Sequence, residues 1–224
     1  MKNPRFLSIL VALFFSGSLM AQFGFHAGPV LRSSKIKVDV PGFGSADFDF
    51  KSTLGFMAGV NYRLPIGTSF ALQPELNWMS KGGKSEDLDL LGEITYNLNY
   101  LELPINFLYT GGNSSGFYAG GGPALNFGIS GKAKVDGESV DVEWGDEELK
   151  RTHIAFNLLA GYRLEGGFDV SAFFSRSITS SAPSSSDAEF EGANWSFTNI
   201  GLRLGYALGT GEMKSAKTKL KQVL

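Results

Sequence analysis

Five charged residues interrupt segments of the chain that are otherwise apolar or rich in glycine. Polar and apolar residues alternate around each charge, so the charged residue falls on the polar side of its segment. Two carboxylates and three guanidinium groups on one enclosed surface would form ion pairs, because unpaired charges are costly to bury. The five residues are Arg63, Glu75, Glu102, Arg163 and Arg203.

We expect Glu75, Glu102 and Arg203 near the middle of this surface, with Arg203 bridging both carboxylates. Arg63 and Arg163 are expected nearer one end. The cluster has two interpretations: packing that stabilises the fold, or a path for protons or ions. We interpret it as structural packing.

Other residues suited to chemistry are few. The chain has no cysteine, which excludes a disulfide, a thiolate metal site, a cysteine nucleophile and a lipoprotein anchor. Its two histidines, His26 and His153, are expected at opposite ends and cannot share one site. His153 beside carboxylates of the rim is the only candidate general base. The acidic segment 136–148 lacks the spacing of a calcium loop, so we predict no metal, no cofactor and no enzymatic activity.

The elements that position these residues are strands, and residues 99–109 (NYLELPINFLY) show the clearest pattern. One alternate set is entirely apolar or aromatic, whereas the other contains Glu102. Alternation with a period of two predicts a β-strand with two different faces. The length of the stretch also matches the roughly 9–11 residues of a tilted membrane-spanning strand.

Seven further segments alternate in the same way, so the predicted fold is all-β, an eight-stranded antiparallel up-and-down transmembrane β-barrel. Its connections alternate long and short, as in outer-membrane barrels with short periplasmic turns and longer outer loops. Two of the long connections, residues 35–50 and 133–150, are expected to be loops. The strands are expected over residues 23–34, 53–64, 69–80, 94–109, 116–132, 151–164, 168–178 and 194–208.

The two faces of the strands indicate which side meets lipid. In a membrane barrel the apolar face is outside, which places the five charged residues inside. A soluble barrel with a ligand cavity would reverse the faces. Aromatic residues near the strand ends, such as Trp78, Tyr109 and Tyr162, are typical of interfacial girdles and favour the membrane barrel.

The ends of the chain differ from the barrel in composition. Residues 1–21 have the pattern of a secretory signal peptide, with Lys2 and Arg5 before an apolar run and small residues before Gln22. The barrel is expected over residues 22–209. Residues 210–224 are predicted to be a basic periplasmic tail, either solvated or in contact with anionic lipid or a partner.

Several segments resemble the PorT-like family of outer-membrane β-barrels. They are LQPELNWMSKGGK (72–84), YLELPINF (100–107), FYAGGGPALNFG (117–128) and NIGLRLGYAL (199–208). This resemblance implies an integral outer-membrane protein of eight strands. One branch of the family is implicated in the type IX secretion system, but most members have no assigned activity. The continuation beyond the last strand departs from the usual family pattern.

The sequence therefore predicts a protein of the Gram-negative outer membrane with a structural, surface-interaction or secretion-accessory role. The alternatives are a narrow pore for passive transport and a soluble periplasmic ligand-binding barrel. The expected partners are outer-membrane lipid, lipopolysaccharide and secretion-system or envelope proteins. No basic and aromatic surface suggests a nucleic acid partner.

Overall fold

The computed structural model of the protein describes residues 22–40, 44–85, 94–111, 115–135, 138–145, 149–182 and 193–208. The predicted signal peptide, residues 1–21, and the predicted basic tail, residues 210–224, lie outside these residues. The described residues form ten β-strands: β1 (Gln22–Val40), β2 (Gly44–Asp49), β3 (Thr53–Ile66), β4 (Phe70–Lys84), β5 (Ile94–Tyr109), β6 (Gly116–Val135), β7 (Glu138–Asp141), β8 (Thr152–Arg163), β9 (Phe168–Ser177) and β10 (Ala193–Ala207).

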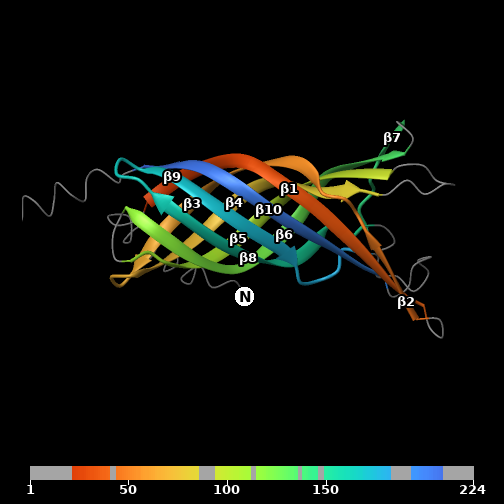
Figure 1. The fold of residues 1–224 in the computed structure, drawn as a ribbon, viewed down its shortest axis with the longest axis horizontal. Helices are drawn as coiled ribbons and strands as arrows, with labels where there is room; N and C mark the ends of the chain where they lie inside the picture. Colours follow the sequence, from red (N-terminus) through yellow and green to blue (C-terminus); the bar gives the residue numbers. More distant parts are fainter. Residues whose placement is uncertain are drawn as a thin grey trace, which may run out of the picture.

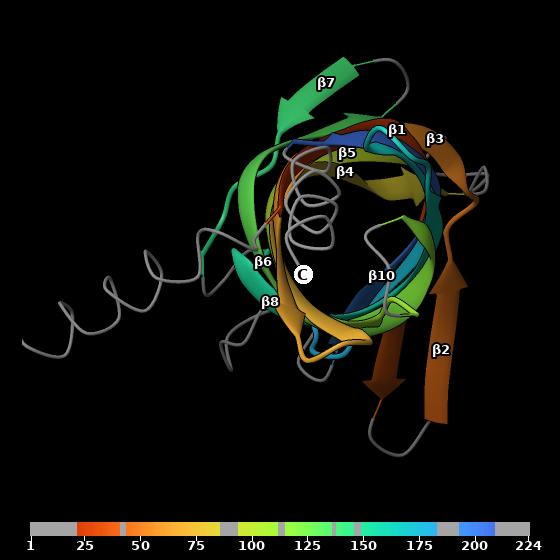
Figure 2. The same ribbon diagram turned by 90° about the vertical axis from the view of Figure 1, so that its left-hand side faces the viewer.

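Eight of these strands form a closed antiparallel barrel, which confirms the predicted fold. Around the ring the order is β1, β3, β4, β5, β6, β8, β9 and β10, and β10 pairs with β1 to close it. The closing register runs from Gly24↔Ala207 to Val38↔Ala193. Figure 2 shows the closed ring of strands in a view along the barrel. β5 occupies the residues expected from its alternation.

The two ends of the barrel differ in how their strands are connected. Short connections, residues 67–69, 110–115 and 164–167, lie at one end, which we call the turn end. The longer connections lie at the other end, which we call the loop end. Gly67 and Gly166 have φ angles of 65° and 96°, which glycine adopts without steric cost and which allow the tight turns.

The loop end contains more strand than the sequence analysis predicts. β1 continues to Val40 and pairs with β2, so much of residues 35–50 is a hairpin and not a loop. β6 likewise continues to Val135 and pairs with β7, which corrects the expected loop at 133–150. Each extension persists because a second strand satisfies its backbone hydrogen-bonding groups. Both hairpins extend beyond the barrel at the loop end (Figure 1).

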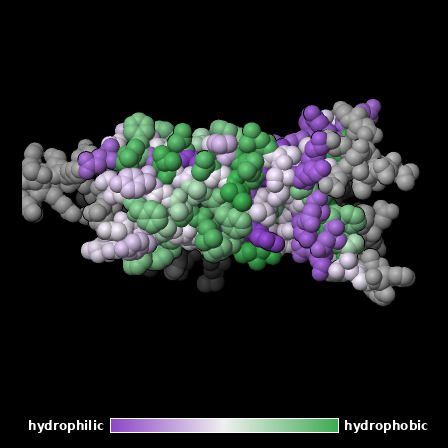
Figure 3. All heavy atoms as spheres, in the orientation of Figure 1, coloured by the Kyte–Doolittle hydropathy of each residue, from purple (hydrophilic) through white to green (hydrophobic). Residues whose placement is uncertain are grey.

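The outer face of the barrel is apolar and the inner face is largely polar. Leu204, Phe117 and Leu158 are 69%, 58% and 49% exposed on the outside, whereas Glu102 and Gln73 are 0% and 1% exposed on the inside. Figure 3 shows apolar residues over the middle of the visible face and hydrophilic residues gathered toward the loop end. This is the arrangement that a barrel surrounded by lipid requires. Across the part of the chain that the structure describes, no helix is long and apolar enough to cross a membrane.

Candidate functional site

The interior of the barrel is the candidate site, and Glu102 on β5 lies at its centre. Its Oε2 accepts a hydrogen bond from Lys81 Nζ on β4 at 2.9 Å. Asn157 Nδ2 on β8 donates to Oε1 at 3.1 Å, and Ser175 Oγ on β9 donates to Oε2 at 3.3 Å. β4, which is adjacent to β5, and β8 and β9, which lie beyond β6, therefore supply donors to one buried carboxylate. These donors satisfy much of its hydrogen-bonding capacity.

The second buried carboxylate, Glu75 on β4, binds Arg203 of β10 across the barrel. Arg203 Nη1 lies 2.9 Å from Glu75 Oε2, and Arg203 Nε donates to Ser171 Oγ at 3.1 Å. Three side-chain amides of β4 and β5 also donate to Glu75: Gln73 at 2.7 Å, Asn77 at 3.0 Å and Asn106 at 3.2 Å. This dense hydrogen bonding stabilises the ionised form of a carboxylate that has lost its water.

His26 on β1 belongs to the same group of residues. Its Nε2 lies 2.9 Å from Asn77 Oδ1, and its Nδ1 accepts a hydrogen bond from Asn61 Nδ2 at 3.1 Å. In that arrangement Nε2 carries the proton, which makes the ring neutral. His26 then connects the amides of β3 and β4 and holds them in place.

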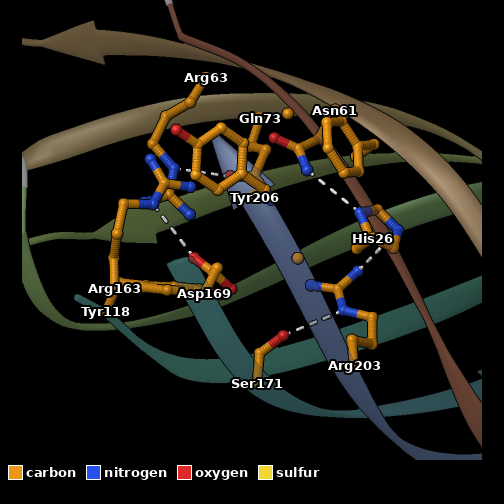
Figure 4. Close-up of a pocket in the computed structure, with 13 residues that line it drawn as sticks. His26, Asn61, Arg63, Gln73, Tyr118, Arg163, Asp169, Ser171, Arg203 and Tyr206 are labelled. Carbon is orange, nitrogen blue, oxygen red and sulfur yellow. Dashed lines mark hydrogen bonds and ion pairs between the residues drawn. The ribbon is translucent and has the colours of Figure 1, made fainter. Parts of the chain in front are cut away.

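Nearer the turn end, β3 and β8 supply two further arginines to one region of the interior. Arg163 Nε donates to Asp169 Oδ2 at 3.1 Å, and its Nη1 donates to Gln22. Tyr118 OH donates to the other oxygen of Asp169. Arg63 donates from Nε to Gln73 Oε1 at 2.6 Å, and its Cζ lies 4.3 Å from the centre of the Tyr118 ring. All of these side chains except Gln22 line a small cavity of about 10 Å³ (Figure 4).

At the loop end, aromatic side chains close the interior. Tyr100 packs edge-on against Trp144, with ring centres 5.5 Å apart, and lies 5.8 Å from Phe197. Leu98 and Leu149 complete this buried group, and Trp195 packs against it. Segment 142–145, beyond β7, thereby folds over the interior. We call these residues the aromatic cap.

His153 lies in the aromatic cap, where no carboxylate of the described residues is hydrogen-bonded to it. Its ring is 5.1 Å from that of Tyr100 and 5.5 Å from that of Phe197. Neither ring nitrogen has a hydrogen-bond partner among the described residues. Among the described residues, no hydroxyl or carboxylate is therefore hydrogen-bonded to His153. Within the same residues, no group of three or more His, Cys, Asp or Glu side chains could hold a metal ion.

The structure places all five predicted charged residues inside the barrel, each at most 7% exposed. Arg63 and Arg163 lie near the turn end, as expected from their positions in the strands. The expected bridge from Arg203 to both carboxylates is wrong for Glu102, which pairs with Lys81 on the neighbouring strand.

Sequence reasoning missed three interior charges. Lys81 lies one residue beyond the predicted end of its strand, although the alternation of Glu75 and Asn77 continues to it. Arg32 lies on β1 inside the barrel, where Nε donates to Thr53 Oγ1 and Nη1 to the Lys81 carbonyl. Asp169 lies on β9, where its Oδ2 accepts from Arg163. Arg32 and Asp169 fall within predicted strands, and their faces follow from the alternation, whereas Lys81 is found only by continuing the alternation past residue 80.

Comparisons with known proteins identify relatives of the same architecture. The family described as outer membrane protein beta-barrel domain matches residues 15–183. The chain is similar to the outer membrane protein OprG from Pseudomonas aeruginosa, with 13% identity and a TM-score of 0.47, over 84% of this chain and 96% of that chain. It is also similar to neisserial surface protein A, with 13% identity and a TM-score of 0.43, over 83% of this chain and 97% of that chain.

A third similar structure is the attachment invasion locus protein Ail of Yersinia pestis, solved in complex with the heparin analogue sucrose octasulfate. It shares 13% identity and a TM-score of 0.42 with this chain, over 83% of this chain and 99% of Ail. A search of curated proteins gives no match to the sequence.

Proposed function

This chain belongs to the outer membrane protein beta-barrel domain family, and on that premise we propose that it is a non-conducting membrane anchor that presents two hairpins at the cell surface. It is an integral protein of the outer membrane. The proposal assigns it a structural and surface-interaction role and no enzymatic activity. Outer-membrane barrels have their short turns in the periplasm, so the loop end faces outward.

The filled interior is the observation that carries this proposal. Lys81, Tyr100 and Glu102 are each 0% exposed at the level of the central ion pair and the aromatic cap. An eight-stranded barrel encloses a space just wide enough for side chains to fill. Ions crossing such a barrel would have to displace paired and hydrogen-bonded charges, so we favour an anchor over the alternative of a narrow pore.

Planar bilayer recordings test this choice. The full chain, folded in detergent and inserted into bilayers, should produce no discrete conductance steps in potassium chloride. A double variant, Tyr100→Ala with Trp144→Ala, removes two rings of the aromatic cap. Its conductance is compared with that of the unaltered protein. Reproducible single-channel steps from the unaltered protein would instead support the narrow pore.

The two hairpins supply the surface for interaction. All side chains of β2 and β7 are exposed, including Phe48 and Val140 at 49% and 61%. Lys35 lies 2.9 Å from Asp47 and 3.5 Å from Asp49, which links the two strands of the first hairpin. The hydrogen bond to Asp47 raises the pKa of the Lys35 ammonium above its usual value.

Lipopolysaccharide is the proposed lipid partner around the loop end. Lys134, Arg151 and Arg176 are exposed there, and Arg151 Cζ lies 5.5 Å from the ring of Phe127 on the outer face. Cations at this level would meet the phosphates of lipopolysaccharide. Lipopolysaccharide should raise the unfolding temperature of the folded protein in detergent more than it raises that of an Arg151→Gln, Arg176→Gln variant. An equal rise in unfolding temperature for the parent and the variant would contradict binding of lipopolysaccharide by Arg151 and Arg176.

A secretion-accessory role is the second candidate function. It is supported by the PELNW and YLELP segments, which resemble PorT-like barrels of the type IX secretion system. In a cell with that system, deleting this protein should leave secreted cargo in the periplasm, and re-expression should restore secretion. Normal secretion in the deletion strain would exclude this role and leave the anchor function standing.

A further inference from the structure

The described interior contains more positive than negative charge. Its buried cationic side chains are Arg32, Lys81, Arg63, Arg163 and Arg203, and its carboxylates are Glu75, Glu102 and Asp169. Lys81 pairs with Glu102, Arg203 with Glu75 and Arg163 with Asp169. Arg32 and Arg63 therefore have no carboxylate partner of their own among the described residues.

The two surplus arginines differ in how well oxygen acceptors surround them. Arg32 donates from Nε to Thr53, from Nη1 to the Lys81 carbonyl and from Nη2 to Asn97. Arg63 donates from Nε to Gln73 Oε1, and its guanidinium group also interacts with Tyr118, whose ring centre lies 4.3 Å from Arg63 Cζ. Arg32 thus donates to three oxygen acceptors, whereas the neighbours of Arg63 are one amide oxygen and one tyrosine.

Arg63 also lies next to a second arginine. Arg63 and Arg163 line the same cavity near the turn end (Figure 4), and Arg163 acts on Arg63 as a neighbouring like charge. Asp169 is the one carboxylate lining this cavity, and it already accepts from Arg163 and Tyr118. Arg203 also lines the cavity, but it is paired with Glu75. One negative charge therefore faces the guanidinium groups of Arg63 and Arg163, although both are withdrawn from solvent, at 7% and 3% exposed.

We propose that this cavity is an anion site that binds a small oxyanion, a phosphate or a carboxylate, between Arg63 and Arg163 from the turn end of the barrel. Guanidinium groups donate to two oxygens of such groups at once and keep their charge when buried. A cavity of about 10 Å³ has room for one water-sized group, such as one oxygen of the anion. The anion would neutralise the surplus charge of Arg63.

Thermal unfolding of the full chain in neutral detergent micelles tests the site, with inorganic phosphate and acetate titrated separately against chloride at constant ionic strength. Binding to the folded state alone should raise the unfolding temperature with the logarithm of anion concentration above Kd, by about 5–10 °C at a hundredfold excess over Kd. A rise with phosphate alone assigns a phosphate site, and a rise with acetate alone assigns a carboxylate site. An unfolding temperature in phosphate and in acetate equal to that in chloride would overturn the proposal.

Two variants separate anion binding from a purely structural role of Arg63. Arg63→Gln removes the surplus charge, so the anion-dependent rise should disappear while the anion-free unfolding temperature stays within a few degrees of the parent. Arg63→Lys keeps the charge but loses the two-pronged donor geometry, so it should retain a smaller rise. Lys132→Gln, which removes an exposed cation of β6 at the loop end, is the control and should respond like the parent. An undiminished rise in Arg63→Gln would refute the site, as would a large anion-free loss of stability in that variant.

Discussion

Lys81 and Glu102 show how a single pair of residues can determine whether this interior is stable. Their side chains are 1% and 0% exposed, so neither charge is screened by water. Asn157 and Ser175 donate to the carboxylate, while Lys81 Nζ lies 5.7 Å from the centre of the Tyr100 ring. Removing either charge would leave the other buried and unpaired.

Replacing Glu102 with glutamine should therefore destabilise the protein. Breaking a buried ion pair by removing one partner costs about 3–5 kcal/mol, which corresponds to a fall of about 10 °C in unfolding temperature for a chain of this size. The measurement is the temperature at which the folded band is lost in gel electrophoresis without prior boiling. The double variant Lys81→Met, Glu102→Leu is the control, because an apolar pair of similar volume restores much of the stability. An unchanged transition in Glu102→Gln would contradict a structural role for the pair.

At the scale of strands, the barrel was predictable because its alternation repeats. One-sided burial fixes which residues face inward, since a shift of one residue would reverse both faces. Phe173 shows the limit of this reasoning. It shares a face with Asp169 and Ser171, and the structure buries it inside, where Gly201 leaves room for its ring.

The partners of the interior charges were harder to predict than their positions. Alternation predicts whether a side chain faces the interior or the lipid. Which interior charges form ion pairs depends on how the strands are staggered around the ring. Glu102 lies opposite Asn77 in the β4–β5 register, yet its charge partner is Lys81, further along β4. The two hairpins were missed for a similar reason: they are short strand pairs outside the barrel, where charged residues obscure the apolar alternation.

The aromatic cap depends on one small residue of β6. A Cβ atom added to Gly128 would overlap the ring of Trp144. Gly128→Ala should therefore displace Trp144 from Tyr100 and Phe197 and destabilise the barrel by about 1–3 kcal/mol. Tryptophan fluorescence should shift to longer wavelength as the ring meets water.

Gly145→Ala is the matched control for this prediction, because a Cβ added there meets nothing within 4 Å. Its fluorescence and unfolding temperature should match those of the parent. Equal spectra for both variants would show that Trp144 does not depend on the space at Gly128.

The whole molecule has two unlike ends, and this asymmetry sets its direction in the membrane. Exposed hairpins extend from the loop end, whereas the turn end has three short connections (Figure 1). Polar hairpins and long connections are accommodated in water outside the cell, while short turns suit the periplasmic side. Lipid therefore surrounds the barrel at the apolar band between the two ends.

Cysteine labelling in intact cells tests this orientation, because the chain contains no cysteine of its own. Ser45→Cys on β2 and Ser139→Cys on β7 place a thiol on exposed positions of the two hairpins, and Thr68→Cys places one on an exposed turn. A maleimide that cannot cross the outer membrane should label the two hairpin variants in intact cells. It should label Thr68→Cys only after the membrane is permeabilised. Labelling of Thr68→Cys alone in intact cells would reverse the orientation and place the hairpins in the periplasm.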